Sequence, residues 1–212
     1  MIKIFIVDDH AIVREGLRQI LQDVPDMVIA GEAFNGIEAL EQIRKNNYNY
    51  DIVVLDISMP GMNGIDVLKQ LKLEKPEIAV LMLTIFPEDQ YAIRALKNGA
   101  SGYLTKDSVP DELVAALKKI SQGGKYITLS IAERLSSILL PDSDKQPHEI
   151  LSDREYQIMC MIAKGKPLKT IAEDLSVSIK TISTYRSRIL EKMNLKTNAD
   201  IIRYAIEEGL IQ

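Results

Sequence analysis

Polar residues that follow the apolar runs of the N-terminal half are the first candidates for chemistry. Asp8 and Asp9 follow "IFIV", Asp56 follows "IVVL", Thr84 follows "VLML", and Lys106 comes shortly after "GYL". Three carboxylates held close together repel one another, and a bound divalent cation relieves that repulsion. Such hard oxygen donors suit Mg²⁺, which takes few protein ligands and shares phosphate oxygens. A carboxylate beside the ion can attack a phosphoryl group, whose oxygens then need a cation and a hydroxyl such as Lys106 and Thr84.

A scaffold that gathers these residues must bring several strand ends to one edge. Short apolar runs alternate with amphipathic segments, which predicts strands and helices in turn. The predicted strands are residues 3–7, 28–33, 52–55, 79–83 and 102–104, and the predicted helices are residues 12–21, 36–45, 64–73, 88–98 and 110–122. This order predicts an α/β fold with a doubly wound, five-stranded parallel sheet. In such sheets, ligands bind beyond the carboxyl ends of the strands.

Each acid taken alone has a simpler explanation. An Asp after a strand can cap the next helix or open a turn. An acid can also hold a ribose, but "VDDHAIVREG" lacks the glycines of a dinucleotide site. We expect His10 to start the following helix or to lie at the sheet edge rather than to bind metal. The joint occurrence of these acids with Thr84 and Lys106 favours a phosphoryl site.

The pattern of the chain changes after residue 122. Residues 123–149 contain a predicted short helix at residues 130–139 and then a polar stretch flanked by Pro141 and Pro147, which indicates a linker. Residues 150–212 show helical patterns only, and Ser152 with Glu155 forms the pattern of a capping box. We therefore expect an α/β domain at residues 1–122, a linker at residues 123–149 and a small all-α domain at residues 150–212.

Two amphipathic segments of the C-terminal part are joined by a predicted tight turn at residues 176–178. The second segment, residues 179–193, carries a stripe expected to face the core, namely Ile182, Tyr185, Ile189 and Met193. Cations and hydroxyls outside this stripe are candidate DNA contacts: Lys169, Lys180, Thr181, Ser183, Thr184, Ser187 and Arg188. Such side chains suit a helix that enters a major groove. Two amphipathic helices with a short turn also occur in ordinary core packing.

Charge is distributed unevenly along this chain of net charge −4. Residues 150–212 hold ten Lys and Arg against eight Asp and Glu, whereas residues 1–149 hold sixteen against twenty-two. A basic segment on an acidic protein fits a polyanionic partner, and a solvated helix face has a similar composition. The chain has no apolar run of eighteen residues, and Asp8 and Asp9 come too early for a signal peptide. We expect a cytoplasmic protein with no membrane partner, in which Cys160 is packed rather than reactive.

Residues 1 to about 122 resemble the receiver domain of two-component response regulators. The motifs that carry the resemblance are "IVDDH", "VVLDISMPGMNG", "LMLT" and "GYLTKD". The resemblance implies a flavodoxin/CheY-like fold in which Asp56 accepts the phosphoryl group. It also implies that Mg²⁺ is bound by Asp8, Asp9, Asp56 and the backbone carbonyl of Ser58.

The same resemblance assigns three residues to the switch that follows phosphorylation. Thr84 would be the switch hydroxyl, Lys106 the cation that pairs with the phosphate, and Tyr103 the aromatic side chain that changes rotamer. Lys106 is followed by Asp107 rather than by proline, a pair that is familiar from the NarL/FixJ subfamily.

Residues 150–212 resemble the helix-turn-helix DNA-binding domain of NarL/FixJ (LuxR-type) regulators, through "LSDRE" and "GKPLKTIAEDLSVSIKTISTYRSRILEKMNLKTNADIIRYAIEEGLI". The resemblance implies that residues 179–193 form the recognition helix and that residues 198–207 form a helix used in dimer contacts. Where many members have Thr-Val-Lys-x-His, this chain has Thr181-Ile182-Ser183-Thr184-Tyr185. A lysine that contacts a base or a phosphate is thus replaced by Ser183.

Together the two resemblances imply a transcription factor that phosphorylation activates and that is not an enzyme beyond its own phosphoryl transfer and dephosphorylation. The expected partners are a sensor histidine kinase, double-stranded promoter DNA, a second copy of the chain when phosphorylated, and RNA polymerase. A haloacid-dehalogenase-like phosphatase would need a second acid two residues after Asp56, where this chain has Ser58. A receiver that works without phosphate and a small-ligand sensor on the same DNA-binding domain are further alternatives.

Overall fold

The computed structural model describes residues 1–45, 50–108, 110–138 and 146–211. Contacts along the chain divide it into two units, Met1–Ser137 and Ile138–Gln212. The short helix that was predicted within the linker falls in the first unit, except for its last residue, Ile138. Each unit is described by itself.

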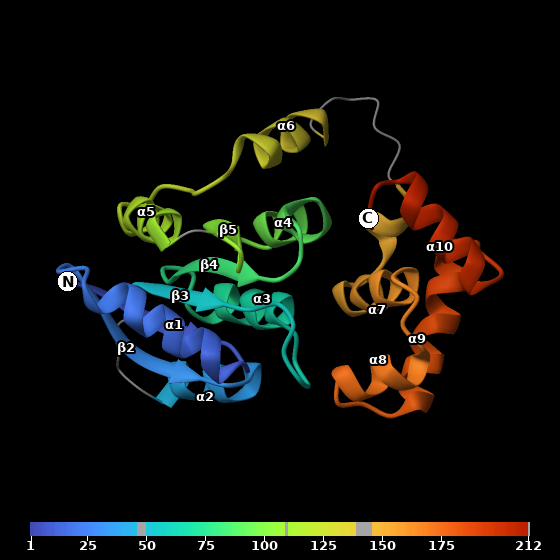
Figure 1. The fold of residues 1–212 in the computed structure, drawn as a ribbon, viewed down its shortest axis with the longest axis horizontal. Helices are drawn as coiled ribbons and strands as arrows, with labels where there is room; N and C mark the ends of the chain where they lie inside the picture. The colour runs from blue at the N-terminus through green and yellow to red at the C-terminus, as the bar shows by residue number, and fades with distance from the viewer. Residues whose placement is uncertain (46–49, 109, 139–145, 212) are drawn as a thin grey trace. The chain divides into compact units, whose positions relative to one another are not determined.

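The first unit is the predicted α/β fold. Its strands are β1 (Ile2–Val7), β2 (Met27–Ala33), β3 (Ile52–Leu55), β4 (Ala79–Thr84) and β5 (Gly102–Thr105). Its helices are α1 (Ala11–Gln22), α2 (Gly36–Lys45), α3 (Gly64–Glu74), α4 (Glu88–Lys97), α5 (Pro110–Ser121) and α6 (Leu129–Ile138). The strands form one parallel sheet in the order β2-β1-β3-β4-β5 (Figure 1). The doubly wound five-stranded sheet is confirmed.

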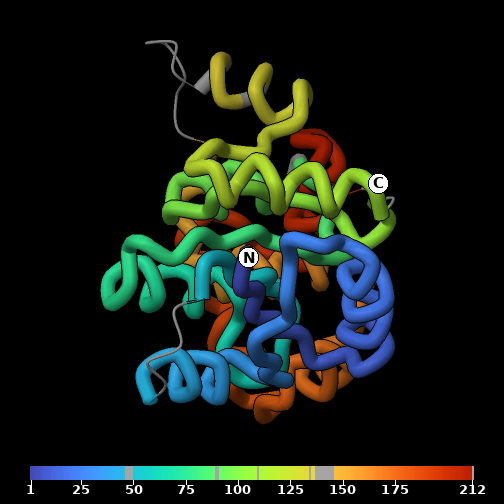
Figure 2. Tube along the Cα trace, turned by 90° about the vertical axis from the view of Figure 1, so that its left-hand side faces the viewer, coloured from blue at the N-terminus to red at the C-terminus, as the bar shows by residue number. Residues whose placement is uncertain are grey.

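Helices cover both faces of this sheet. One apolar core joins alternate strand residues to α1 and α5, and its members include Ile4, Ile6, Ile52, Val54, Leu81, Leu17, Leu21, Leu113 and Leu117. Successive strand residues point to opposite faces, so the intervening residues Phe5, Val53 and Met82 are buried on the other side. Helix α2 lies there, across the sheet from α1 (Figure 2). Burial on both faces explains why β3 is a continuous apolar run.

The second unit is all helical in the part that the structure describes. It contains a 3₁₀ helix, η1 (Pro147–Ile150), and the helices α7 (Asp153–Ala163), α8 (Leu168–Asp174), α9 (Ile179–Lys192) and α10 (Asn198–Glu207). The predicted capping box of Ser152 and Glu155 starts α7, and a second capping box of Thr197 and Asp200 starts α10. Between α8 and α9, Ser176 adopts a left-handed φ of 52°, which makes the predicted turn tight.

Most predicted elements are confirmed to within two residues, but two details differ. Tyr185 is half-buried on α9 and does not join the buried residues Ile182 and Ile189 in the core. Pro147 starts η1, whereas Pro141 and residue 139, the predicted end of the linker helix, lie outside the described residues. No helix in the described ranges is long and apolar enough to cross a membrane.

Candidate functional site

Two neighbouring strands deliver two carboxylates to the same edge of the sheet. Strand β1 pairs with β3 so that Val7 lies opposite Leu55, and the Asp56 amide donates to the Val7 carbonyl at 2.9 Å. Asp8 and Asp56 therefore follow paired strand ends, with exposed fractions of only 3% and 1%. Placing two acids in such a site requires cations, because unpaired buried carboxylates are strongly destabilising.

Lys106 supplies a cation to both of these acids. Its Nζ lies 2.7 Å from Asp8 Oδ2 and 2.7 Å from Asp56 Oδ2, so one ammonium bridges both acids. Burial raises the pKa of Asp56, against the opposing effect of Lys106. Burial alone would lower the pKa of Lys106, but the two carboxylates outweigh it and raise this pKa. The amide of Ser58 donates to the other Asp56 oxygen at 3.3 Å.

Asp9 and His10 complete the cluster. Asp8, Asp9, His10 and Asp56 each place one potential ligand atom within 4.8 Å of the others. His10 Nδ1 lies 3.1 Å from Asp9 Oδ1 without hydrogen-bond geometry, so this buried oxygen has no hydrogen-bond partner among the described residues. His10 also caps the start of α1, as expected, and its amide donates to Asp8 Oδ1 at 2.8 Å. The cluster thus holds an unsatisfied acidic oxygen that a cation would satisfy.

The loop after β3 fits closely around the Asp56 backbone. Asn63 is the N-cap of α3, and its side chain accepts from the Asp66 amide at 2.9 Å. The Gly64 amide donates to the Ile57 carbonyl at 2.9 Å. A Cβ on Gly64 would lie 2.0 Å from the Asp56 carbonyl oxygen, so only glycine fits there.

In the second unit, α9 presents the candidate DNA contacts. Lys180, Ser183, Thr184, Ser187 and Arg188 are exposed on this helix, and Thr181 is half-buried at its start. Lys169 is exposed on the preceding helix α8. Ser178 caps α9 through the Thr181 amide at 3.0 Å, which fixes where the helix begins. Cations and hydroxyls therefore share one open face, as DNA recognition requires.

Comparison with known proteins decides the family. Residues 4–118 match the response regulator receiver domain, and residues 149–205 match the luxR family of bacterial regulatory proteins. The chain is 36% identical over 211 residues to the response regulator UvrY of Escherichia coli (strain K12), covering 99% of this chain and 96% of UvrY. The oxygen regulatory protein NreC of Staphylococcus epidermidis is 35% identical over 218 residues, covering 99% of each.

This chain is a response regulator of the NarL/FixJ family. A solved structure of RcsB from Salmonella enterica serovar Typhimurium, bound to promoter P1flhDC in the presence of the phosphomimetic BeF3-, has a TM-score of 0.60 and 26% identity. That comparison covers 96% of this chain and 97% of the other. This response regulator thus combines a receiver domain and a LuxR-type DNA-binding domain. The receiver domain carries a cluster of acids at the edge of its sheet.

The two remaining switch candidates of this response regulator contact the loop between β4 and α4. Thr84 is fully buried, and its hydroxyl accepts from the Phe86 amide at 3.5 Å. Tyr103 is also fully buried and donates to the Phe86 carbonyl at 2.9 Å. Its ring already occupies an inward position, and the rotamer change on activation stays a prediction.

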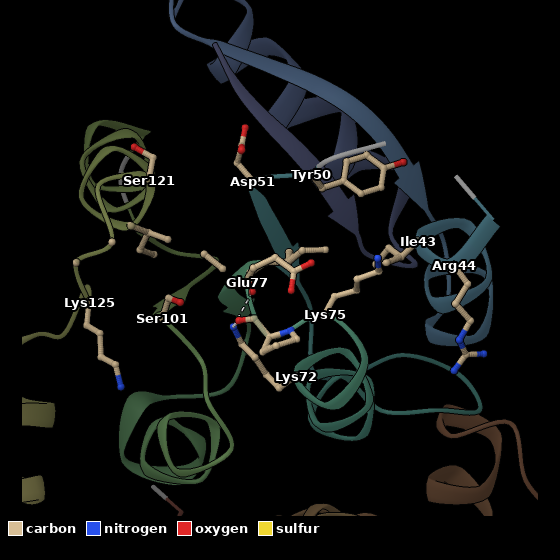
Figure 3. Close-up of a pocket in the computed structure, with 16 residues that line it drawn as sticks. Ile43, Arg44, Tyr50, Asp51, Lys72, Lys75, Glu77, Ser101, Ser121 and Lys125 are labelled. Atoms are coloured by element: carbon tan, nitrogen blue, oxygen red, sulfur yellow. Dashed lines mark hydrogen bonds between the residues drawn. The ribbon is translucent and has the colours of Figure 1, made fainter. Parts of the chain in front are cut away.

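A second hollow, of about 710 Å³, lies at the opposite edge of the sheet (Figure 3). Its volume alone would make it a candidate ligand site, but the positions of its charged residues have an explanation that needs no ligand. It is lined by residues at or beyond the C-terminal ends of α2, α3 and α5, including Arg44, Lys75 and Lys125. Cations there offset the negative ends of the helix dipoles, and Lys72 donates to the Pro76 and Ile78 carbonyls. We therefore place the site at the acid cluster.

The sequence did not predict a role for two residues near the acid cluster, Arg14 and Gly64. Arg14 Nη1 donates to the Asp8 carbonyl at 2.7 Å, and Arg14 Nε donates to Glu32 at 3.3 Å. These bonds fix the turn that carries the acidic pair. The helical spacing of four residues between His10 and Arg14 could have indicated that this side chain reaches back to the turn.

Proposed function

We propose that this response regulator is a DNA-binding transcriptional regulator that is activated when Asp56 accepts a phosphoryl group from a histidine kinase. The observation that carries the proposal is the Asp56 carboxylate, 1% exposed, bridged through one ammonium to Asp8. One cation would satisfy a single buried acid, and a second carboxylate beside it would then only add repulsion. A nucleophile that must meet a highly charged group needs charge compensation on several sides.

Mg²⁺ is the metal that fits these residues. The ligand atoms of Asp8, Asp9 and Asp56 lie within 4.8 Å of one another, and one of the Asp9 oxygens is buried without a partner. Hard carboxylate oxygens together with the expected Ser58 carbonyl are typical of a Mg²⁺ site that leaves positions for phosphate. The ion, when bound, would neutralise charge on the incoming phosphoryl oxygens.

The chain's own residues then supply the chemistry. One Asp56 oxygen attacks phosphorus, and the bond from phosphorus to the donor nitrogen of a phosphohistidine breaks, with the nitrogen keeping the electron pair. Burial raises the pKa of Asp56, and Lys106 opposes this rise by favouring the charged carboxylate, the form that attacks phosphorus. Lys106 then pairs with the transferred phosphoryl oxygens in place of the free carboxylate.

The output of the switch would be DNA binding through α9. Solved RcsB structures of similar sequence include one described as two RcsB dimers bound to two parallel DNAs, with a TM-score of 0.59 and 25% identity. We infer a comparable twofold arrangement here after phosphorylation. Twofold symmetry would place half-sites roughly 10 bp apart or a multiple of that distance.

Intact mass spectrometry with acetyl phosphate tests the phosphorylation step directly. We expect one phosphoryl adduct on the wild-type chain that requires Mg²⁺ and is absent from Asp56→Asn. An adduct that persists in the variant would place the acceptor elsewhere, and no adduct on the wild type would contradict the proposal. Sustained hydrolysis of a phosphomonoester would instead support the phosphatase alternative.

A further inference from the structure

Tyr185 lies beside several of the candidate DNA contacts of α9 rather than in the core. It is half-buried and helps to line a hollow of about 340 Å³. The other residues that line this hollow are Ser178, Lys180, Thr181, Thr184 and Arg188. The phenol therefore shares an open site with two cations.

Two aliphatic hydroxyls of this face already donate hydrogen bonds within α9. Thr184 donates to the Lys180 carbonyl at 3.0 Å, and Ser187 donates to the Ser183 carbonyl at 3.1 Å. Each hydroxyl carries one proton, so neither can donate to DNA without losing a bond inside its own helix. Ser178 and Thr181 share a hydrogen bond of 2.8 Å, which uses one of their two protons.

The Tyr185 hydroxyl is different. Among the residues that the structure describes, it makes no hydrogen bond, and neither Lys180 nor Arg188 makes an ion pair. A phenol donor that shares a hollow with two cations matches an anion that carries several acceptor oxygens. The backbone phosphate of DNA is such an anion.

We propose that Tyr185, Lys180 and Arg188 form a site for one phosphate of the DNA backbone, with the phenol donating to a non-bridging oxygen. This inference rests on the proposed DNA-binding function. It would give a phosphate contact to a helix in which Ser183 stands where many members of the family have lysine. A phosphate contact positions the helix and carries no direct sequence information.

Fluorescence anisotropy on the full-length protein, treated with acetyl phosphate and Mg²⁺, tests the site. The probes are a duplex enriched from a random pool by the wild-type chain and a mixed-sequence duplex. Tyr185→Phe removes only the hydroxyl, and we expect about tenfold weaker binding to both duplexes. The salt dependence should not change, because a phenol releases no counterion. Lys180→Gln and Arg188→Gln should each reduce the slope of log affinity against log salt by about 0.9.

Tyr126→Phe is the matched control, since it also removes a phenol hydroxyl, one that donates to Glu112 at 3.1 Å in the first unit. We expect less than about a twofold effect on DNA affinity, because this hydroxyl lies outside the DNA-binding domain. Unchanged binding by Tyr185→Phe would overturn the proposal, and so would a loss confined to the enriched duplex, which would mean a base contact. Wild-type protein that binds neither duplex would contradict the proposed function itself. Thermal unfolding of each variant checks that the fold is retained.

Discussion

Opposing electrostatic effects act on Asp56, the residue on which the proposed switch depends. Burial raises the pKa of its carboxyl, and the Lys106 ammonium, 2.7 Å away, opposes that rise. The same ammonium also lies 2.7 Å from Asp8 Oδ2, so it pairs with two carboxylates that a divalent cation would also use. Lys106 would therefore support the acid cluster and compete with the metal for its oxygens.

Replacing Lys106 should separate these two roles. In Lys106→Met the acids lose their internal cation, so we expect Mg²⁺ to bind about tenfold more tightly at neutral pH while phosphorylation by acetyl phosphate slows. Isothermal titration calorimetry measures the first effect and intact mass the second. Weaker Mg²⁺ binding by the variant would show that Lys106 does not compete with the metal.

The raised pKa of Asp56 predicts how stability depends on pH. The folded state holds the Asp56 proton more tightly than the unfolded state, so this contribution is present below the ordinary Asp pKa of about 3.9. It is lost as pH rises through the raised folded value. Asp56→Asn removes the ionisation, and its stability relative to the wild type should increase as pH rises through this window without Mg²⁺. Urea midpoints from about pH 4 to about pH 8 provide the measurement, and a difference that stays constant with pH would contradict the assignment.

Gly64 makes a steric prediction at the same site. A methyl group there would lie 2.0 Å from the Asp56 carbonyl oxygen, so Gly64→Ala should lower the free energy of unfolding by roughly 2 kcal/mol or more and slow phosphorylation. The control is Gly16→Ala in α1, where a Cβ meets nothing within 4 Å and should stabilise the helix by about 1 kcal/mol. Urea unfolding compares the two, and equal effects would count against the close contact.

Among the secondary-structure elements, periodicity predicted which segments are strands and helices but not where they end. Strand β4 includes Thr84 because its carbonyl accepts from the Lys106 amide at 2.8 Å across the sheet. Such pairing depends on a neighbour more than twenty positions away, which local pattern cannot show. The prediction that Tyr185 faces the core with the other apolar residues of α9 was wrong. Its ring lies at the edge of the apolar face, where a phenol can keep its hydroxyl in water.

The acid cluster was predictable for a different reason. Strand ends in a parallel sheet meet at one edge, so the positions of Asp8, Asp56 and Lys106 followed from the element order alone. The contacts between these side chains could not be predicted from the element order. The bridge made by one ammonium and the approach of His10 to Asp9 depend on side-chain rotamers, which a sequence pattern does not encode.

An ion pair between elements supports the second unit. Lys192, at the end of α9, lies 2.6 Å from Glu155, whose side chain is 4% exposed at the start of α7. Burial alone would raise the pKa of Glu155, but Lys192 and the Ser152 amide and hydroxyl outweigh it and lower this pKa. The stabilisation is therefore present above the ordinary Glu pKa of about 4.3 and is lost as pH falls through the folded value.

Lys192→Met should reveal this pair. We expect the second unit to lose about 2 kcal/mol of unfolding free energy near neutral pH, because Glu155 keeps its charge without its cation. The difference from the wild type should shrink as pH falls and both proteins lose the ionised Glu155. Urea unfolding followed by circular dichroism measures this, and a difference that grows toward acid pH would contradict the stated direction of the pKa.

In the whole molecule, phosphorylation of the first unit must change the affinity of the second unit for DNA if the proposed function is right. The receiver provides the acid cluster, and the LuxR-type domain provides the exposed face of α9. Adding a phosphoryl group brings almost two negative charges to a site that already holds three acids, which is enough to bias a switch of a few kcal/mol.

The most direct test of this coupling is DNA affinity measured with and without phosphorylation in the same titration. Full-length protein is titrated into a labelled duplex enriched by the wild-type chain, with and without acetyl phosphate and Mg²⁺, beside Asp56→Asn. We expect wild-type affinity to rise at least about tenfold on treatment, within the usual range of allosteric coupling, and the variant to stay at the untreated value. Equal affinity before and after complete phosphorylation of the wild type, or the same rise in Asp56→Asn, would contradict activation of DNA binding through Asp56.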